Sequence, residues 1–116
     1  MKPSALFIIN SDPRSSSRPA EGIRIAAGIG VWKQVAVTVS LCGAAVLIIG
    51  DCVEGLVDEE DFIRYLPILG GLGHPVFVQT DAPFLKEIGP PTLPIESLTL
   101  PQLAELAAAS TYVIRF

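Results

Sequence analysis

Two uninterrupted apolar segments constrain the fold of this chain more than any other feature. Residues 5–10 read ALFIIN, and residues 35–41 read VAVTVSL, the second rich in β-branched side chains. Continuous apolar runs of this length are typical of strands that are buried on both faces inside a parallel sheet. Because parallel neighbours need a long crossover between them, usually a helix, the two runs predict an α/β fold.

The rest of the chain supplies the other elements of such a fold. Pro19 suits the start of a helix, and helix-spaced apolar residues continue the pattern over 19–31. We further expect, in order, a short helix at 42–49, a helix from Asp58 to Leu69, a strand at 75–79, a short helix at 82–88, a brief strand at 93–96, a helix at 99–109 and a strand at 111–116. This order predicts a three-layer α/β/α sandwich, flavodoxin-like, with a mostly parallel sheet of about five strands in a single domain over residues 1–116.

Two of the expected helices begin with recognisable caps. Asp58 is placed to accept hydrogen bonds from the first turn of its helix, which should bury Ile63 on its apolar face and be kinked or shortened by Pro67. Thr99 and Gln102 have the spacing of a capping box, which predicts the start of the last helix.

Charge and apolar content limit the partners. The chain has 8 basic and 12 acidic side chains, for a net charge of −4, so nucleic acid is a poor partner. Half of its 116 residues are hydrophobic, more than so small a domain can bury. The surplus should form surface patches, which predicts a homo-oligomer or a complex with another protein.

No segment has the pattern of a membrane span or a signal peptide. The longest nearly uncharged stretch, residues 35–50, is shorter than the ~20 apolar residues that cross a bilayer. The apolar run that follows Met1 is short and lacks a small-residue cleavage site. With two cysteines and no C-x-x-C pair, the chain is expected to be a cytoplasmic protein with reduced thiols and no membrane contact.

Cys42 is the candidate catalytic residue. It follows a buried strand and precedes Gly43 at the expected start of a helix, a position that lowers the pKa of a thiol and makes it a nucleophile or sulfur acceptor. The alternative is an inert, buried thiol that behaves as a small hydrophobic side chain, which is the more frequent case. Cys52 lies beside Asp51 and Glu54, whose charges disfavour a thiolate, so we interpret it as structural.

Other polar residues suggest weaker sites. The loop from Ser11 to Arg18 has hydroxyls, two arginines and a helix start that could hold the phosphate of a flavin or nucleotide, but it lacks the glycines of a phosphate loop. Asp58–Asp61 fit the first turn of a helix better than a cation site. His74 has no ligand-spaced neighbour, and Asp81 fits a helix cap as well as a general base. We therefore expect no metal and no cofactor.

The order of several short motifs resembles that of the DsrE/DsrF-like sulfur-relay family. The likeness runs from the first apolar strand into Ser11-Asp12-Pro13, through Val76-Phe77-Val78 and Leu85-Lys86-Glu87-Ile88-Gly89, to the closing Tyr112-Val113-Ile114-Arg115-Phe116, which is similar to the last strand of TusC and DsrF subunits. The resemblance covers nearly the whole chain. It implies a parallel α/β fold, an oligomer, and transfer of persulfide sulfur between proteins for tRNA thiolation or sulfur oxidation.

One departure from that family changes the expected role. In catalytic members the sulfur-carrying cysteine follows the strand that matches residues 75–79, whereas this chain has Gln79-Thr80-Asp81-Ala82 there. The leading interpretation is therefore a non-catalytic subunit of a homo- or hetero-oligomer in sulfur handling. The alternatives are a sulfurtransferase-like persulfide carrier that uses Cys42 and, as the weakest, a flavin- or nucleotide-binding module.

Overall fold

A five-stranded sheet, parallel throughout, forms the centre of the computed structural model, which describes residues 2–50, 52–73 and 75–116. The elements are β1 (Ser4–Ile9), α1 (Arg18–Trp32), β2 (Ala36–Leu41), the 3₁₀ helix η1 (Gly43–Ile49), α2 (Glu59–Gly70), β3 (Val76–Gln79), β4 (Ile95–Leu98), α3 (Leu100–Ala109) and β5 (Tyr112–Arg115). The predicted strands are therefore confirmed in number and direction, with end points that shift by one or two residues.

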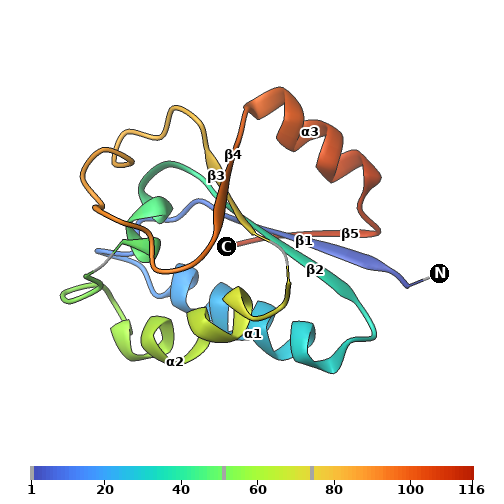
Figure 1. Cartoon of the computed structure of the whole chain (residues 1–116), viewed down its shortest axis with the longest axis horizontal. Helices are drawn as coiled ribbons and strands as arrows, with labels where there is room; N and C mark the ends of the chain where they lie inside the picture. Colours follow the sequence, from blue (N-terminus) through green and yellow to red (C-terminus); the bar gives the residue numbers. More distant parts are fainter. Residues whose placement is uncertain (1, 51, 74) are drawn as a thin grey trace.

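The strand order explains why helices cover both faces of the sheet. The order is β4-β3-β2-β1-β5, so the chain runs outward from β1 to β4 and then returns to place β5 on the other side of β1. Because parallel crossovers are right-handed, the outward and return connections lie on opposite faces. Figure 1 shows α1 and α2 together on one face and α3 alone on the other. The predicted three-layer, flavodoxin-like or DsrE-like sandwich is confirmed.

The main core lies between the sheet and the pair formed by α1 and α2. Alternate strand residues, among them Phe7, Val39 and Val78, point to this face and are almost fully buried. They meet Ile23 of α1 and Phe62 of α2, which are also buried. Since burial of each large apolar side chain contributes about 1.5–3 kcal/mol, this layer holds most of the apolar stabilisation of the fold.

The opposite face is covered by α3, and more loosely. Its strand residues include the buried Leu6 and Ile8, but α3 itself contains no buried residue. Leu103 and Leu106, three positions apart, are half-buried, as expected for the side of a helix that lies toward a sheet. The capping box that starts α3 is confirmed: Thr99 Oγ1 accepts from the Gln102 N–H at 3.2 Å, and Gln102 Oε1 accepts from the Thr99 N–H at 2.8 Å.

Three predicted elements differ from the structure. Residues 83–87 form consecutive turns instead of a helix over 82–88: the N–H groups of Leu85 and Glu87 donate to carbonyls three residues back, and so short a segment rarely offsets the cost of helix nucleation. The helix predicted at 42–49 is present as the 3₁₀ helix η1. The strand predicted at 93–96 begins only at Ile95, after Pro94.

Helix α2 also departs from expectation in detail. Asp58 occupies the position before the helix in a left-handed conformation (φ 56°), and its side chain makes no capping hydrogen bond, so the predicted cap is wrong. Ile63 is 65% exposed instead of buried, because the neighbouring Phe62 and Leu66 define the face that meets the sheet. Pro67 lies inside α2, yet the helix continues to Gly70.

Candidate functional site

The candidate site lies where β2 and β3 end, side by side at the carboxyl edge of the sheet. The two strands pair Leu41 with Val78, which brings the next residues, Cys42 and Gln79, beside each other. Ligands of parallel α/β sheets bind outside this edge, so both residues occupy the part of the fold where a site is expected.

Gln79 ties the two strand ends together. Its Oε1 accepts from the backbone N–H of Gly43 at 2.9 Å, and its Nε2 donates to Asp81 Oδ1 at 3.0 Å. Gly43 has φ +56°, a conformation that glycine adopts at little cost, and this lets the chain turn out of β2 directly after Cys42. The turn after β2 and the loop after β3 are therefore held in a fixed relation.

The Cys42 thiol belongs to the face of the sheet that carries α3. Cys42 is still extended (φ −121°, ψ 147°), so side chains continue to alternate and the thiol falls on the same face as Ser40. Across the sheet, Ser40 of β2 is paired with Ile8 of β1, and Ile8 is paired with Arg115 of β5, so these three side chains lie on the same face as the thiol. The thiol is half-buried, and it has a hydroxyl and a guanidinium in its surroundings.

The electrostatics of Cys42 differ from the sequence-based expectation. Burial raises the pKa of the Cys42 thiol, while a hydrogen bond with Ser40 and the charge of Arg115 act in the lowering direction without offsetting burial. The expected lowering by a helix start is wrong in direction, because η1 is a short 3₁₀ helix and desolvation outweighs the favourable contacts.

The loop after β3 lies next to this thiol. Gln79-Thr80-Asp81-Ala82 follows β3 and contains no sulfur, and the exposed Thr80 and Asp81 line a hollow of about 330 Å³ with the start of α3. Cys42 is on the adjacent strand, beside Gln79. The pairing of β2 with β3 brings these two positions together although they are more than 30 residues apart in the sequence, as expected for loops that leave the carboxyl ends of neighbouring parallel strands.

The loop from Ser11 to Arg18 uses its arginines internally. Arg14 pairs with Asp12 at 2.8 Å and lies over the ring of Phe84, with its Cζ 4.8 Å from the ring centroid. Arg18 donates to the Arg115 carbonyl at 3.1 Å. Both guanidinium groups already have partners within the chain, which weakens the case for a phosphate site in this loop.

The remaining candidates gain no chemistry from the fold. Cys52 is exposed at a cleft of about 510 Å³ that Arg14, Glu54 and Glu87 also line, and its interpretation as an unreactive, structural thiol stays a prediction. Over residues 2–50, 52–73 and 75–116, no three potential metal-ligating side chains gather, and no helix is long and apolar enough to cross a membrane. The prediction for His74 lies outside the described residues.

Sequence reasoning missed three residues around Cys42, namely Ser40, Gln79 and Arg115. Ser40 is 1% exposed and was part of an apolar strand in the sequence, while Gln79 and Arg115 end strands that are far away along the chain. The alternation of β2 could have placed Ser40 on the Cys42 face, but the other two positions depend on which strands are neighbours.

A comparison with solved structures identifies the fold. The crystal structure of the ychN protein from E. coli aligns with this chain at a TM-score of 0.81 and 20% sequence identity, and the alignment covers 100% of both chains. No family model and no curated protein sequence matches the chain. The chain therefore has the fold of the E. coli ychN protein over its whole length, a parallel, DsrE-like α/β sandwich.

Proposed function

We propose that this protein is an oligomer-forming, DsrE/DsrF-like subunit that takes part in sulfur relay or sulfur oxidation in the cytoplasm through protein contacts, without catalysing the transfer itself. The full-length fold match to the ychN protein is consistent with this role, as is the order of motifs from Ser11 to Phe116. The observation that carries the non-catalytic part is the loop after β3, where Thr80 and Asp81 replace a thiol and cannot form a persulfide.

The surface supports a role through contacts. Five large apolar side chains of the described residues are more than half exposed, at the ends of helices and strands or along α2: Val31, Trp32, Ile63, Leu100 and Tyr112. Single exposed apolar residues are ordinary, but a chain that is half hydrophobic gains from covering them. The partner is a second copy of this chain or a related sulfur-relay subunit.

Two measurements test this proposal together. Light scattering after size exclusion should give a mass above that of one chain, or a stable complex when a related relay subunit is added. Treatment with polysulfide, removal of the excess and intact mass measurement without reductant should show no retained sulfur. A monomer that binds no relay subunit contradicts the proposal, and a stable sulfur adduct contradicts its non-catalytic part.

A second candidate, a sulfurtransferase-like carrier that uses Cys42, is favoured by one observation. The thiol stands beside Gln79 on the adjacent strand, so it faces the same edge of the sheet as the family's carrier position. In this reaction the Cys42 thiolate attacks the terminal sulfur of a donor R–S–SH, the donor S–S bond breaks, and R–S⁻ leaves. The products are Cys42–S–SH and the donor thiolate, with no net oxidation.

The polysulfide experiment separates the two candidates. A carrier gains one or more sulfur atoms that are lost in Cys42→Ser and kept in Cys52→Ser, which is the matched control because Cys52 is the other free and more exposed thiol. If the added sulfur is lost in both variants, or in Cys52→Ser alone, Cys42 is excluded as the sole carrier. A third candidate, flavin or nucleotide binding, has no supporting observation because Arg14 and Arg18 are already partnered.

A further inference from the structure

The connection from β3 to β4 leaves the α1/α2 layer incomplete. It continues the outward direction of the chain, so right-handed crossover places it on the same face as α1 and α2. The connection contains turns and prolines and no helix; near its end Thr92 is hydrogen-bonded to Ile49 of η1, and Leu93 lies against the last turn of α2. Contact is close there, since a Cβ at Gly70 would lie 3.3 Å from that of Leu93.

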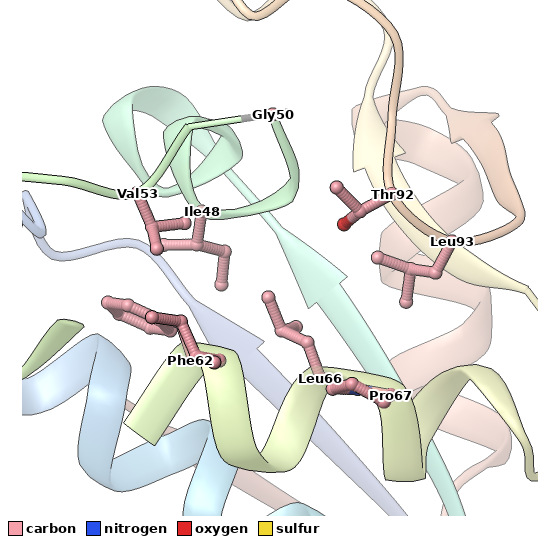
Figure 2. Close-up of a pocket in the computed structure, with 9 residues that line it drawn as sticks. Ile48, Gly50, Val53, Phe62, Leu66, Pro67, Thr92 and Leu93 are labelled. Atoms are coloured by element: carbon pink, nitrogen blue, oxygen red, sulfur yellow. The ribbon is translucent and has the colours of Figure 1, made fainter. Parts of the chain in front are cut away.

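A cleft of about 270 Å³ remains where a crossover helix would normally lie. Figure 2 shows Phe62 and Leu66 of α2 on one side, Ile48 and Val53 above them, and Leu93 across the opening. These side chains come from three segments that are distant in sequence. Phe62, Leu66, Ile48 and Leu93 are at most 9% exposed, so the inner wall is made of core residues and not of mobile surface side chains.

The chemistry of the lining selects against charge. Among the residues that the structure describes, nine line the cleft, and none of these nine carries a charged side chain. The hydroxyl of Thr92 lies at the edge and donates to the Ile49 carbonyl at 3.5 Å, as does the Thr92 N–H at 3.0 Å. An ion in this cleft would lose its hydration without gaining a partner, whereas an uncharged apolar molecule loses only unfavourable contact with water.

The volume limits the size of the molecule. An apolar cavity of about 150 Å³ lined by similar residues holds one benzene ring, and pockets for drug-sized ligands begin at about 300 Å³. A cleft of about 270 Å³ therefore accommodates one ring or two fused rings. We propose that the cleft between α2, η1 and the segment before β4 is a binding site for a compact, uncharged, mainly apolar molecule of this size, a function separate from sulfur handling.

Indole is a suitable probe because it is uncharged, bicyclic and soluble in water. Amide chemical shifts of the ¹⁵N-labelled full chain should change saturably on titration with indole, and the largest changes should fall on Phe62, Leu66 and Leu93. The carboxylate indole-3-acetate should bind about tenfold more weakly or not at all, since the lining offers its charge no partner.

Two tryptophan variants localise the binding. Thr92→Trp places a large side chain at the mouth from an exposed position and should weaken indole binding about tenfold. Leu100→Trp is the matched control, since it adds a similar ring at an exposed position outside the cleft, and it should bind indole as the original chain does. Circular dichroism checks that both variants fold.

Several outcomes overturn the proposal. These are an absence of saturable shifts up to the solubility of indole, shifts centred outside the cleft, or equal binding of indole and its carboxylate. Unchanged indole binding in Thr92→Trp would also overturn the proposal. If the same amides shift on dilution without indole, a side chain of a second copy fills the cleft instead. The shift map of the original chain decides the matter even if Thr92→Trp does not fold.

Discussion

The two faces of the sheet differ in how deeply their covering helices bury apolar side chains. Under α1 and α2, strand residues such as Val39 pack against fully buried helix residues such as Phe62. Under α3, no helix residue is buried, and Val113, which pairs with Leu6 and so lies on the α3 side of the edge strand β5, is exposed.

This difference separates stability from function. The first face provides the closely packed interior that holds the strands in register. The second carries the half-buried Cys42 thiol, the buried Ser40 hydroxyl and the exposed apolar side chains of Leu100 and Val113, which are features of a surface that meets something else. Substitutions on the two faces should therefore differ in cost, and the following predictions run from the largest expected effect to the smallest.

Charge placed on adjacent residues of β2 gives the largest contrast. Val39→Asp puts an unpaired carboxylate on the α1/α2 face at a site that is 3% exposed, which should cost about 3–5 kcal/mol and abolish soluble expression. Thr38→Asp puts the same charge one residue away on the half-buried opposite face and should retain soluble protein. Soluble yield and thermal melting measure both. Equal losses in the two variants would remove the distinction between the faces.

Truncation of one leucine on each face gives the next contrast. Leu66→Ala in α2 leaves a cavity in the main core and should lower the free energy of unfolding by about 2–5 kcal/mol. Leu106→Ala in α3 removes a half-buried side chain and should cost less than half as much. Urea denaturation of the two variants provides the comparison. A larger loss for Leu106→Ala would show that α3 is the better packed helix in solution.

The cap of α3 provides a smaller, local effect. Thr99→Ala removes the hydroxyl that accepts from the Gln102 N–H at 3.2 Å and should cost about 1 kcal/mol. Asp58→Ala is the matched control at the start of α2, because the Asp58 side chain makes no capping hydrogen bond and should lose less. Denaturant midpoints distinguish them, and an effect of Asp58→Ala as large as that of Thr99→Ala would contradict this assignment of the caps.

The smallest effect concerns the pKa of Cys42. Ser40→Ala removes the hydrogen bond that favours the thiolate, so the pKa of Cys42, already raised by burial, should rise further. In a Cys52→Ser background, alkylation by iodoacetamide below this pKa should slow by less than about tenfold, which corresponds to one pKa unit, and the rates should converge at high pH. Thr38→Ala, also on the α3 face, is the control. An unchanged pH profile would exclude a Ser40 contact with the thiolate.

Much of the fold was accessible from local patterns. The apolar runs at 5–10 and 35–41 correctly predicted β1 and β2, because a strand that is buried on both faces must be apolar at consecutive positions. The Thr99 box predicted the start of α3, since all its hydrogen bonds form within four residues. The failures at 82–88 and at Asp58 arose where a segment too short to nucleate a helix and a left-handed turn outweighed helix-like composition.

The candidate site was accessible only in part. The sequence singled out Cys42 and the thiol-free loop after β3, but it treated them as separate positions. Their contact depends on the pairing of β2 with β3 and on the Gln79 hydrogen bond to Gly43, both of which join residues more than 30 positions apart. The direction of the Cys42 pKa shift depends on burial of the thiol, which is set by tertiary packing.

The sequence by itself determined the fold class, the parallel direction of the strands and the capped start of α3, because each follows from the period of burial or from hydrogen bonds within one turn. Only the tertiary structure decided the order β4-β3-β2-β1-β5, the neighbours of Cys42 and the cleft beside α2. These features depend on distances between segments that are far apart along the chain, and such distances are set when the layers pack together.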